Sequence, residues 1–83
     1  MKITVKYFAS IRETIGVGTE SVITSAPTLA ALRDELVARG GPHAQALARG
    51  KTLRMAVNQI MADEAAALLD GAEVAFFPPV TGG

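Results

Sequence analysis

Hydrophobic and polar side chains alternate over residues 2–8. One side of an extended chain there carries three apolar residues, Ile3, Val5 and Tyr7. The other side carries polar residues and ends at Phe8. A period of two that is rich in β-branched and aromatic residues predicts a strand. Residues 20–24 are β-forming as well, so the sequence predicts that the two segments pair as antiparallel neighbours.

Helical spacing replaces this alternation in the next part of the chain. Residues 11–15 predict a short turn of helix, and a longer helix follows whose buried face is marked by Leu29, Leu32 and Leu36. Thr28 is the predicted N-cap of that helix, because its hydroxyl group can accept a hydrogen bond from the first turn. The Gly-Gly-Pro sequence at residues 40–42 predicts its end. Residues 44–48 predict a second short helix.

The last part of the chain returns to strands. Residues 53–58 and 60–61 predict two strands, the second very short, and residues 72–77 predict a final one. The alanine-rich residues 63–69 predict helix on propensity. Pro78 and Pro79 end the final strand, because proline has no N–H group to donate to a sheet.

This order of elements predicts an α+β roll, a mixed sheet of about five strands with one main helix packed on one face. We expect the helix to cover five apolar residues of the outer segments, Ile3, Val5, Tyr7, Val74 and Phe76. The other face then presents Phe8 and Phe77, with Met61 beside them. Apolar side chains exposed together indicate a docking surface for a partner protein. Residues 1–78 are predicted to form one domain and residues 79–83 a flexible tail.

Composition narrows the classes of function. The 83 residues include eight basic and eight acidic side chains, and this balance gives no clustered basic surface for nucleic acid. Without cysteine the chain has no disulfide framework and no thiolate metal site, which favours an intracellular protein. No segment approaches the roughly 18 apolar residues of a membrane span. We therefore expect a cytoplasmic protein that has no membrane partner.

Internal residues offer no complete catalytic or metal-binding set. Gly50-Lys51-Thr52 matches only the end of a phosphate-binding loop, because Gln45 stands where the motif needs its first glycine. We expect a turn there and no bound ATP. His43, the only histidine, has no companion ligand and is predicted to be a solvated loop residue without metal. The C-terminal tail is therefore the best candidate for the functional group.

The tail contains two prolines and ends in two glycines. The prolines direct a stiff, extended segment away from the sheet. The glycines have no Cβ atoms, so they can pass through a channel that excludes larger residues. The terminal carboxylate of Gly83 is a poor electrophile, but it becomes a reactive acyl group once a partner adenylates it with ATP. The chain has no cysteine, so a sulfur nucleophile must come from a partner.

The sequence resembles the small subunit of molybdopterin synthase, a family of sulfur carriers. Four segments carry the resemblance in the same order along the chain: Phe8-Ala9-Ser10-Ile11-Arg12-Glu13, Val57-Asn58-Gln59, Asp70-Gly71-Ala72-Glu73-Val74 and Phe76-Phe77-Pro78-Pro79-Val80-Thr81-Gly82-Gly83. The resemblance implies a ubiquitin-like β-grasp fold. It also implies that an E1-like adenylyltransferase adenylates Gly83 and that a sulfur-donating enzyme supplies the sulfur of a thiocarboxylate.

The resemblance further implies a heterotetramer with the large subunit of the synthase. That subunit receives the tail residues Pro79, Val80, Thr81 and Gly82. Sulfur then passes to cyclic pyranopterin monophosphate, where it forms the dithiolene of molybdopterin. The implied docking residues are Phe8, Arg12, Met61 and Phe77. No cofactor is implied on this chain, and ATP is used by the activating partner.

Three other functions stay open. A sulfur carrier for thiamine thiazole or cysteine synthesis has the same two glycines but generally lacks the Phe-Phe-Pro-Pro approach. A ubiquitin-like modifier would attach to lysines of target proteins through Gly83. A binding module with an inert tail is the third possibility.

Overall fold

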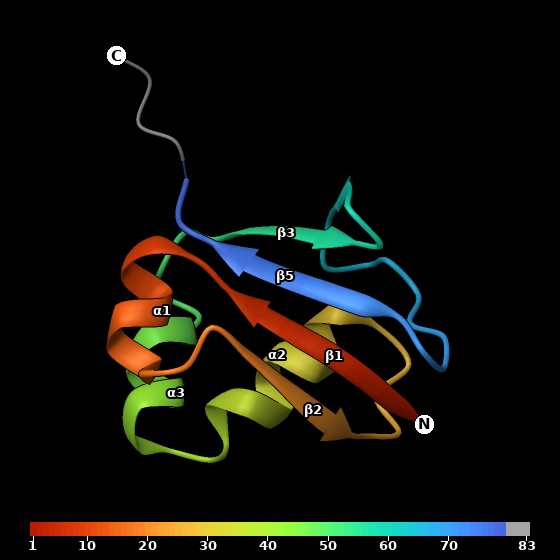
Figure 1. The fold of residues 1–83 in the computed structure, drawn as a ribbon, viewed down its shortest axis with the longest axis horizontal. Helices are drawn as coiled ribbons and strands as arrows, with labels where there is room; N and C mark the ends of the chain where they lie inside the picture. The colour runs from red at the N-terminus through yellow and green to blue at the C-terminus, as the bar shows by residue number, and fades with distance from the viewer. Residues whose placement is uncertain (80–83) are drawn as a thin grey trace.

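Residues 1–79 are described by the computed structural model, and within them five strands form one mixed sheet (Figure 1). The strands are β1 (Lys2–Tyr7), β2 (Thr19–Ile23), β3 (Arg54–Val57), β4 (Ile60–Ala62) and β5 (Glu73–Phe77). Their order across the sheet is β2-β1-β5-β3-β4. The two central strands β1 and β5 are parallel, and the other neighbours are antiparallel. The predicted hairpin of the first two strands is confirmed.

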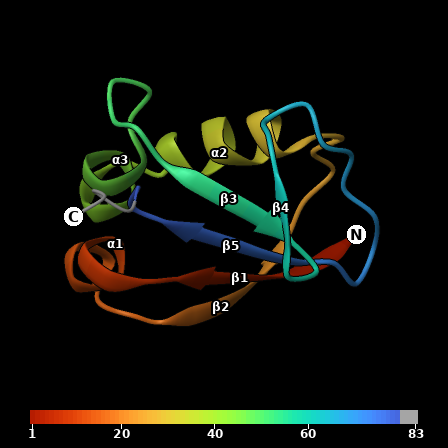
Figure 2. The same ribbon diagram turned by 90° about the horizontal axis from the view of Figure 1, so that it is seen from above.

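Three helices accompany the sheet within the same residues: α1 (Ala9–Ile15), α2 (Leu29–Val37) and α3 (Gly41–Leu47). Figure 2 shows α2 and α3 together on one side of the sheet. Helix α1 lies at the end of the sheet where β1 and β5 finish (Figure 1). Thr28 caps α2 as predicted, since its side chain accepts a hydrogen bond from the amide of Ala31 at 3.2 Å. The arrangement confirms the predicted β-grasp fold.

The core lies between the helices and one face of the sheet. The five apolar strand residues predicted for this face, Ile3, Val5, Tyr7, Val74 and Phe76, are each at most 1% exposed. The three leucines of the α2 stripe are fully buried against them. Alternation in the strands and helical spacing in α2 therefore indicated the core correctly.

The helix predicted at residues 63–69 is wrong. This segment is an irregular loop whose backbone pairs with the start of α2. The amide of Leu29 donates to the carbonyl of Ala66, and the amide of Ala30 donates to the carbonyl of Glu64, both at 3.0 Å. The first amides of a helix have no partner inside the helix, and the loop supplies one for each. Seven residues of favourable propensity do not outweigh these bonds, because so short a helix is marginal by itself.

The boundary between α2 and α3 also differs from the prediction. Helix α2 ends at Val37, and Gly40 and Gly41 turn the chain with φ values of 74° and 54°. Pro42 lies in the first turn of α3, where its missing N–H group costs nothing. As a result, His43 lies in a helix and not in a solvated loop.

Candidate functional site

The face of the sheet opposite α2 and α3 carries an exposed pair of aromatic rings. Phe8 follows β1 and Phe77 ends β5. Because these strands are parallel and Tyr7 pairs with Phe76, the next residues along lie side by side. Their ring centroids are 6.3 Å apart at an interplanar angle of 84°, an edge-to-face contact. Phe8 is 46% exposed and Phe77 is half-buried, and neither belongs to the core.

Small apolar residues lie next to the aromatic pair on this face, although Arg54 on β3 pairs directly with Phe77. Ala75 on β5 pairs with Ala56 on β3, and Ala56 pairs with Met61 on β4. Met61 is 54% exposed. Met61 therefore shares the face with Phe77 but stands two strands away from it, about 10 Å at the usual strand spacing. We call Phe8, Phe77, Ala75, Ala56 and Met61 the open face.

Arg12 borders the open face from helix α1. It lies four residues after Phe8, and its exposed side chain extends over the connection to β2. A Cβ atom at Gly18 would stand only 3.3 Å from Nε of Arg12, so the absence of a side chain there leaves room for the guanidinium group. Its guanidinium group thus lies against the connection that leads into β2. The structure brings Phe8, Phe77 and Arg12 to one end of the molecule, and their role in docking stays a prediction.

The tail leaves the domain at that same end. Phe77 is the last residue of β5, and the half-buried Pro78 and Pro79 follow it. Pro79 is the last residue that the structure describes. The predictions for Val80, Thr81, Gly82 and Gly83 lie outside the described residues.

On the core side of the sheet, the Glu20 carboxylate collects three side-chain donors. Oε2 accepts from the hydroxyl group of Tyr7 at 2.7 Å and lies 2.9 Å from Nε2 of His43. Oε1 accepts from Nη1 of Arg39 at 2.7 Å. The His43 ring also packs edge-to-face on Tyr7, with centroids 5.9 Å apart. The prediction of a solvated loop for His43 was wrong, because its ring contacts Tyr7 on β1 and Glu20 on β2.

The electrostatics of this cluster argue for a structural role. Burial by itself raises the pKa of Glu20, but the hydrogen bonds with His43, Arg39 and Tyr7 outweigh it and lower the pKa to about 2. Burial, together with the Glu20 charge, raises the pKa of Tyr7 far above its ordinary value. Glu20 is thus ionised and fully bonded at neutral pH, with no tendency to take up a proton. A general base that works near pH 7 needs a pKa close to 7, so that it can take up a proton.

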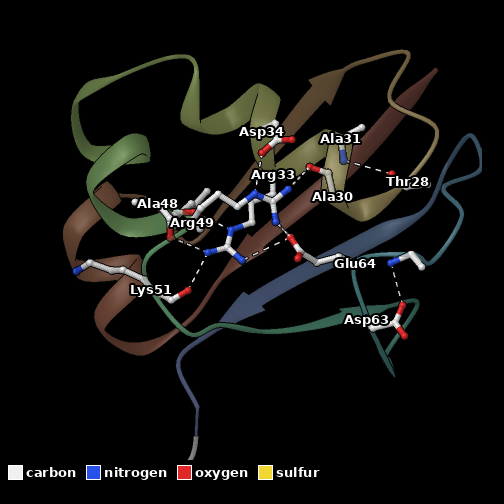
Figure 3. Close-up of polar contacts among 12 residues, drawn as sticks. Thr28, Ala30, Ala31, Arg33, Asp34, Ala48, Arg49, Lys51, Asp63 and Glu64 are labelled. Carbon is white, nitrogen blue, oxygen red and sulfur yellow. Dashed lines mark hydrogen bonds and ion pairs between the residues drawn. The ribbon is translucent and has the colours of Figure 1, made fainter.

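A buried arginine organises the connection between α3 and β3 (Figure 3). Arg33 is 4% exposed and donates to the carbonyls of Leu47, Ala48 and Lys51 at 2.7–2.9 Å. Glu64 contacts both Arg33 and the neighbouring Arg49. The predicted turn at Gly50-Lys51-Thr52 is confirmed, and Arg33 binds its carbonyls. A phosphate-binding loop would instead present a row of free amides.

Arg33 is, with Thr24, one of the buried polar residues of the described part of the chain that sequence reasoning missed. It follows Leu29 by four residues and precedes Leu36 by three, so its spacing places it within the apolar stripe of α2. This helical spacing was the signal in the sequence that could have revealed the burial of Arg33. A charged residue inside such a stripe indicates a buried group that is fully hydrogen-bonded.

Residues 1–79 contain neither a metal-binding cluster nor a membrane-spanning helix. No group of three or more His, Cys, Asp or Glu side chains is placed to hold a metal ion there. Among the helices of those residues, none has the length and apolar character needed to cross a membrane.

Comparison with known proteins is consistent with the fold and the tail. The model of the ThiS family matches residues 5–83. The molybdopterin synthase sulfur carrier subunit of Escherichia coli K12 is 47% identical over 81 residues, which cover 98% of this chain and 99% of that protein. SAMP1 of Haloferax volcanii superimposes with a TM-score of 0.78 at 27% identity, over the full length of both chains. A complex of subunits 1 and 2 of the molybdopterin-converting factor of Helicobacter pylori contains a chain with a TM-score of 0.69 at 25% identity, also over both full lengths.

Proposed function

The chain belongs to the ThiS family and acts as a sulfur carrier subunit of molybdopterin synthase, and we propose that the carboxylate of Gly83 is the group that carries the sulfur. An E1-like adenylyltransferase transfers AMP from ATP to this carboxylate and releases pyrophosphate. A sulfur-donating enzyme then releases sulfur at the oxidation level of sulfide. This sulfur attacks the acyl adenylate, a C–S bond replaces the C–O bond to AMP, AMP leaves, and the product is a thiocarboxylate. The chain has no cysteine, so both the sulfur and the catalytic groups belong to partners.

One observation carries this proposal. The family match runs from residue 5 through residue 83, so it includes the two terminal glycines and the Phe-Phe-Pro-Pro approach to them. Two glycines by themselves would suit any carrier or modifier of this fold. The approach sequence and the 47% identity to the Escherichia coli subunit favour the molybdopterin pathway.

The thiocarboxylate is delivered to the large subunit of the synthase, in a heterotetramer. The large subunit holds cyclic pyranopterin monophosphate and receives the tail residues from Pro79 to Gly83. Because thiocarboxylates are ionised at neutral pH, the anionic sulfur is the nucleophile, as in thiolate chemistry. We place these reactions in the cytoplasm, where ATP and the soluble partners are available.

The open face is the docking surface in this proposal. Its aromatic pair lies at the point where the tail begins, so a partner that receives the tail also covers Phe8 and Phe77. Exposed aromatic rings at the centre of an interface contribute a large share of binding energy. Met61 extends the apolar contact toward β4, and Arg12 adds a charge at its border.

Intact-mass analysis of the chain purified from its native host tests the sulfur chemistry. We expect a fraction in which one oxygen of the terminal carboxylate is replaced by sulfur. Deletion of Gly83 removes that fraction and abolishes sulfur transfer while the unfolding midpoint stays unchanged. An ordinary carboxylate in every molecule would favour the inert module. Covalent conjugates of higher mass would favour a modifier, the function named for the similar SAMP1, the small archaeal modifier protein 1.

A second test concerns docking. Phe77→Asp places a charge in the aromatic pair, so we expect the Kd for the large subunit to rise at least about 30-fold. Ile23→Asp is the matched control, because Ile23 is 74% exposed and pairs with Lys2 at the far end of β1. Circular dichroism should show both variants folded. If Phe77→Asp unfolds the domain, Phe77 belongs to the core and the docking assignment fails.

A further inference from the structure

A small polar hollow lies beside the base of the tail. It has a volume of about 140 Å³ and is lined by α1, α3, the connection before β3, and Pro78. Ser10, Thr14, Lys51 and Thr52 supply its polar groups, and Ile11 and Pro78 contribute apolar walls. These residues come from four separate parts of the sequence, which only the fold brings together.

The size of the hollow limits what it can hold. Small-molecule sites generally occupy about 300–1,000 Å³, so the hollow is smaller than the usual site for a nucleotide or a pterin. A cavity of about 150 Å³ in another protein accommodates a molecule as small as benzene. The hollow therefore suits one amino-acid side chain.

The chemistry of the hollow favours an anionic side chain. Lys51 contributes an ammonium group, and the three hydroxyl groups are potential donors. No side-chain hydrogen bond or ion pair within residues 1–79 uses any of these four groups. The apolar walls match the methylene stem that separates a carboxylate from its backbone. Glutamate or aspartate satisfies both requirements.

The backbone of Lys51 is held in place although its ammonium group is unused. Its amide donates to the carbonyl of Ala48 at 2.9 Å, and its carbonyl accepts from Arg33 at 2.9 Å. Figure 3 shows the side chain extending away from the arginine cluster. The charge is thus presented from an ordered backbone, which lowers the entropy lost when an anion binds.

The position of the hollow identifies the occupant as part of a protein. The four residues beyond Pro79 span at most about 14 Å when fully extended. A partner that encloses the tail tip must therefore bring its surface against the residues around Pro78. The hollow is continuous with the base of the tail and stands at the same end as the open face.

We propose that this hollow is a socket for a carboxylate side chain on the rim of the large subunit, where Lys51 pairs with it and Ser10, Thr14 and Thr52 donate to it. The inference rests on the proposed function. It adds a polar, charge-selective contact to the apolar docking surface. Such a contact sets the orientation of the carrier as the tail enters, because a single ion pair at the rim defines a rotational position that an apolar surface does not.

Binding of the intact carrier to the purified large subunit tests the socket. We expect Lys51→Ala to raise the Kd about tenfold, the value of one charge-assisted hydrogen bond, and Lys51→Glu to raise it further. Lys2→Glu is the matched control, since Lys2 is an exposed cation at the start of β1. Its Kd should stay within about twofold of the wild type. Thr14→Val keeps the shape of the socket and should weaken binding by a smaller factor than Lys51→Ala.

Zero-length carbodiimide coupling of the same complex identifies the occupant. A peptide that joins Lys51 to an aspartate or glutamate of the large subunit supports the socket. Coupling of Lys51 to Gly83 of its own chain, or no Lys51 product, overturns it. Lys51 variants that bind like the wild type also overturn the socket, while the proposed function stands. A wild-type carrier that does not bind the large subunit overturns both.

Discussion

Replacing Glu20 with glutamine removes the charge that holds Tyr7, Arg39 and His43 together. The carboxylate is only 22% exposed, and its three partners lower its pKa from 4.5 to about 2. The difference between these two pKa values corresponds to about 3 kcal/mol of folding free energy. The folded-state pKa lies below the unfolded value. The contribution is therefore complete above pH 4.5 and is lost as the pH falls toward 2.

The assay is urea unfolding of the wild type and of Glu20→Gln at a series of pH values from 2 to 7. At pH 7 we expect the variant to be less stable by up to about 3 kcal/mol, and near pH 2 we expect the two proteins to converge. Glu13→Gln is the matched control, because Glu13 is an exposed residue of α1. Curves for wild type and Glu20→Gln that stay parallel from pH 2 to 5 would refute the reasoning.

Two further predictions each compare a buried residue with an exposed residue of the same type. Arg33→Met leaves three backbone carbonyls of the α3–β3 connection without their donor, so we expect a loss of about 3–5 kcal/mol in urea unfolding. Arg49→Ala, at a side chain 44% exposed, should cost less than about 1 kcal/mol, and equal losses would contradict the structural role of Arg33. Met55→Ala opens the core and should cost about 2–5 kcal/mol, because Met55 is 6% exposed. Met61→Ala should leave stability within about 0.5 kcal/mol but weaken binding to the large subunit, and an unchanged Kd would remove Met61 from the docking surface.

The two secondary-structure errors have different physical causes. Residues 63–69 have helical propensity, but their backbone is needed by the unpaired amides at the start of α2. His43 follows Gly-Gly-Pro, which resembles a loop locally, but the proline occupies the first turn of α3 and the ring packs on Tyr7. At residues 63–69 a contact distant in sequence outweighed a local preference, whereas at residues 40–42 the local sequence itself suits the start of a helix.

Parts of the site differ in how far the sequence could predict them. The hypothesis for the tail came from the sequence, because its chemistry depends on adjacent residues and a free carboxylate, and the role of Gly83 stays a prediction. The exposure of Phe8 and Phe77 followed from strand alternation. Their edge-to-face contact depends on the parallel register of β1 and β5, which pairs residues about seventy positions apart. Met61 was placed on the correct face, but its distance from Phe77 depends on the order of the strands.

By itself, the sequence indicated which apolar residues of the strands and of the main helix are buried and where most turns lie, and it led to the proposal that the reactive group is at the C-terminus. These properties are local, since periodicity, capping and turn chemistry act over a few residues. The Glu20 cluster, the three hydrogen bonds from Arg33 to backbone carbonyls and the polar hollow around Lys51 could be found only from the tertiary structure. Each of these gathers groups from segments far apart in the chain. Their arrangement depends on how the sheet is ordered and how the helices pack on it, which local patterns do not specify.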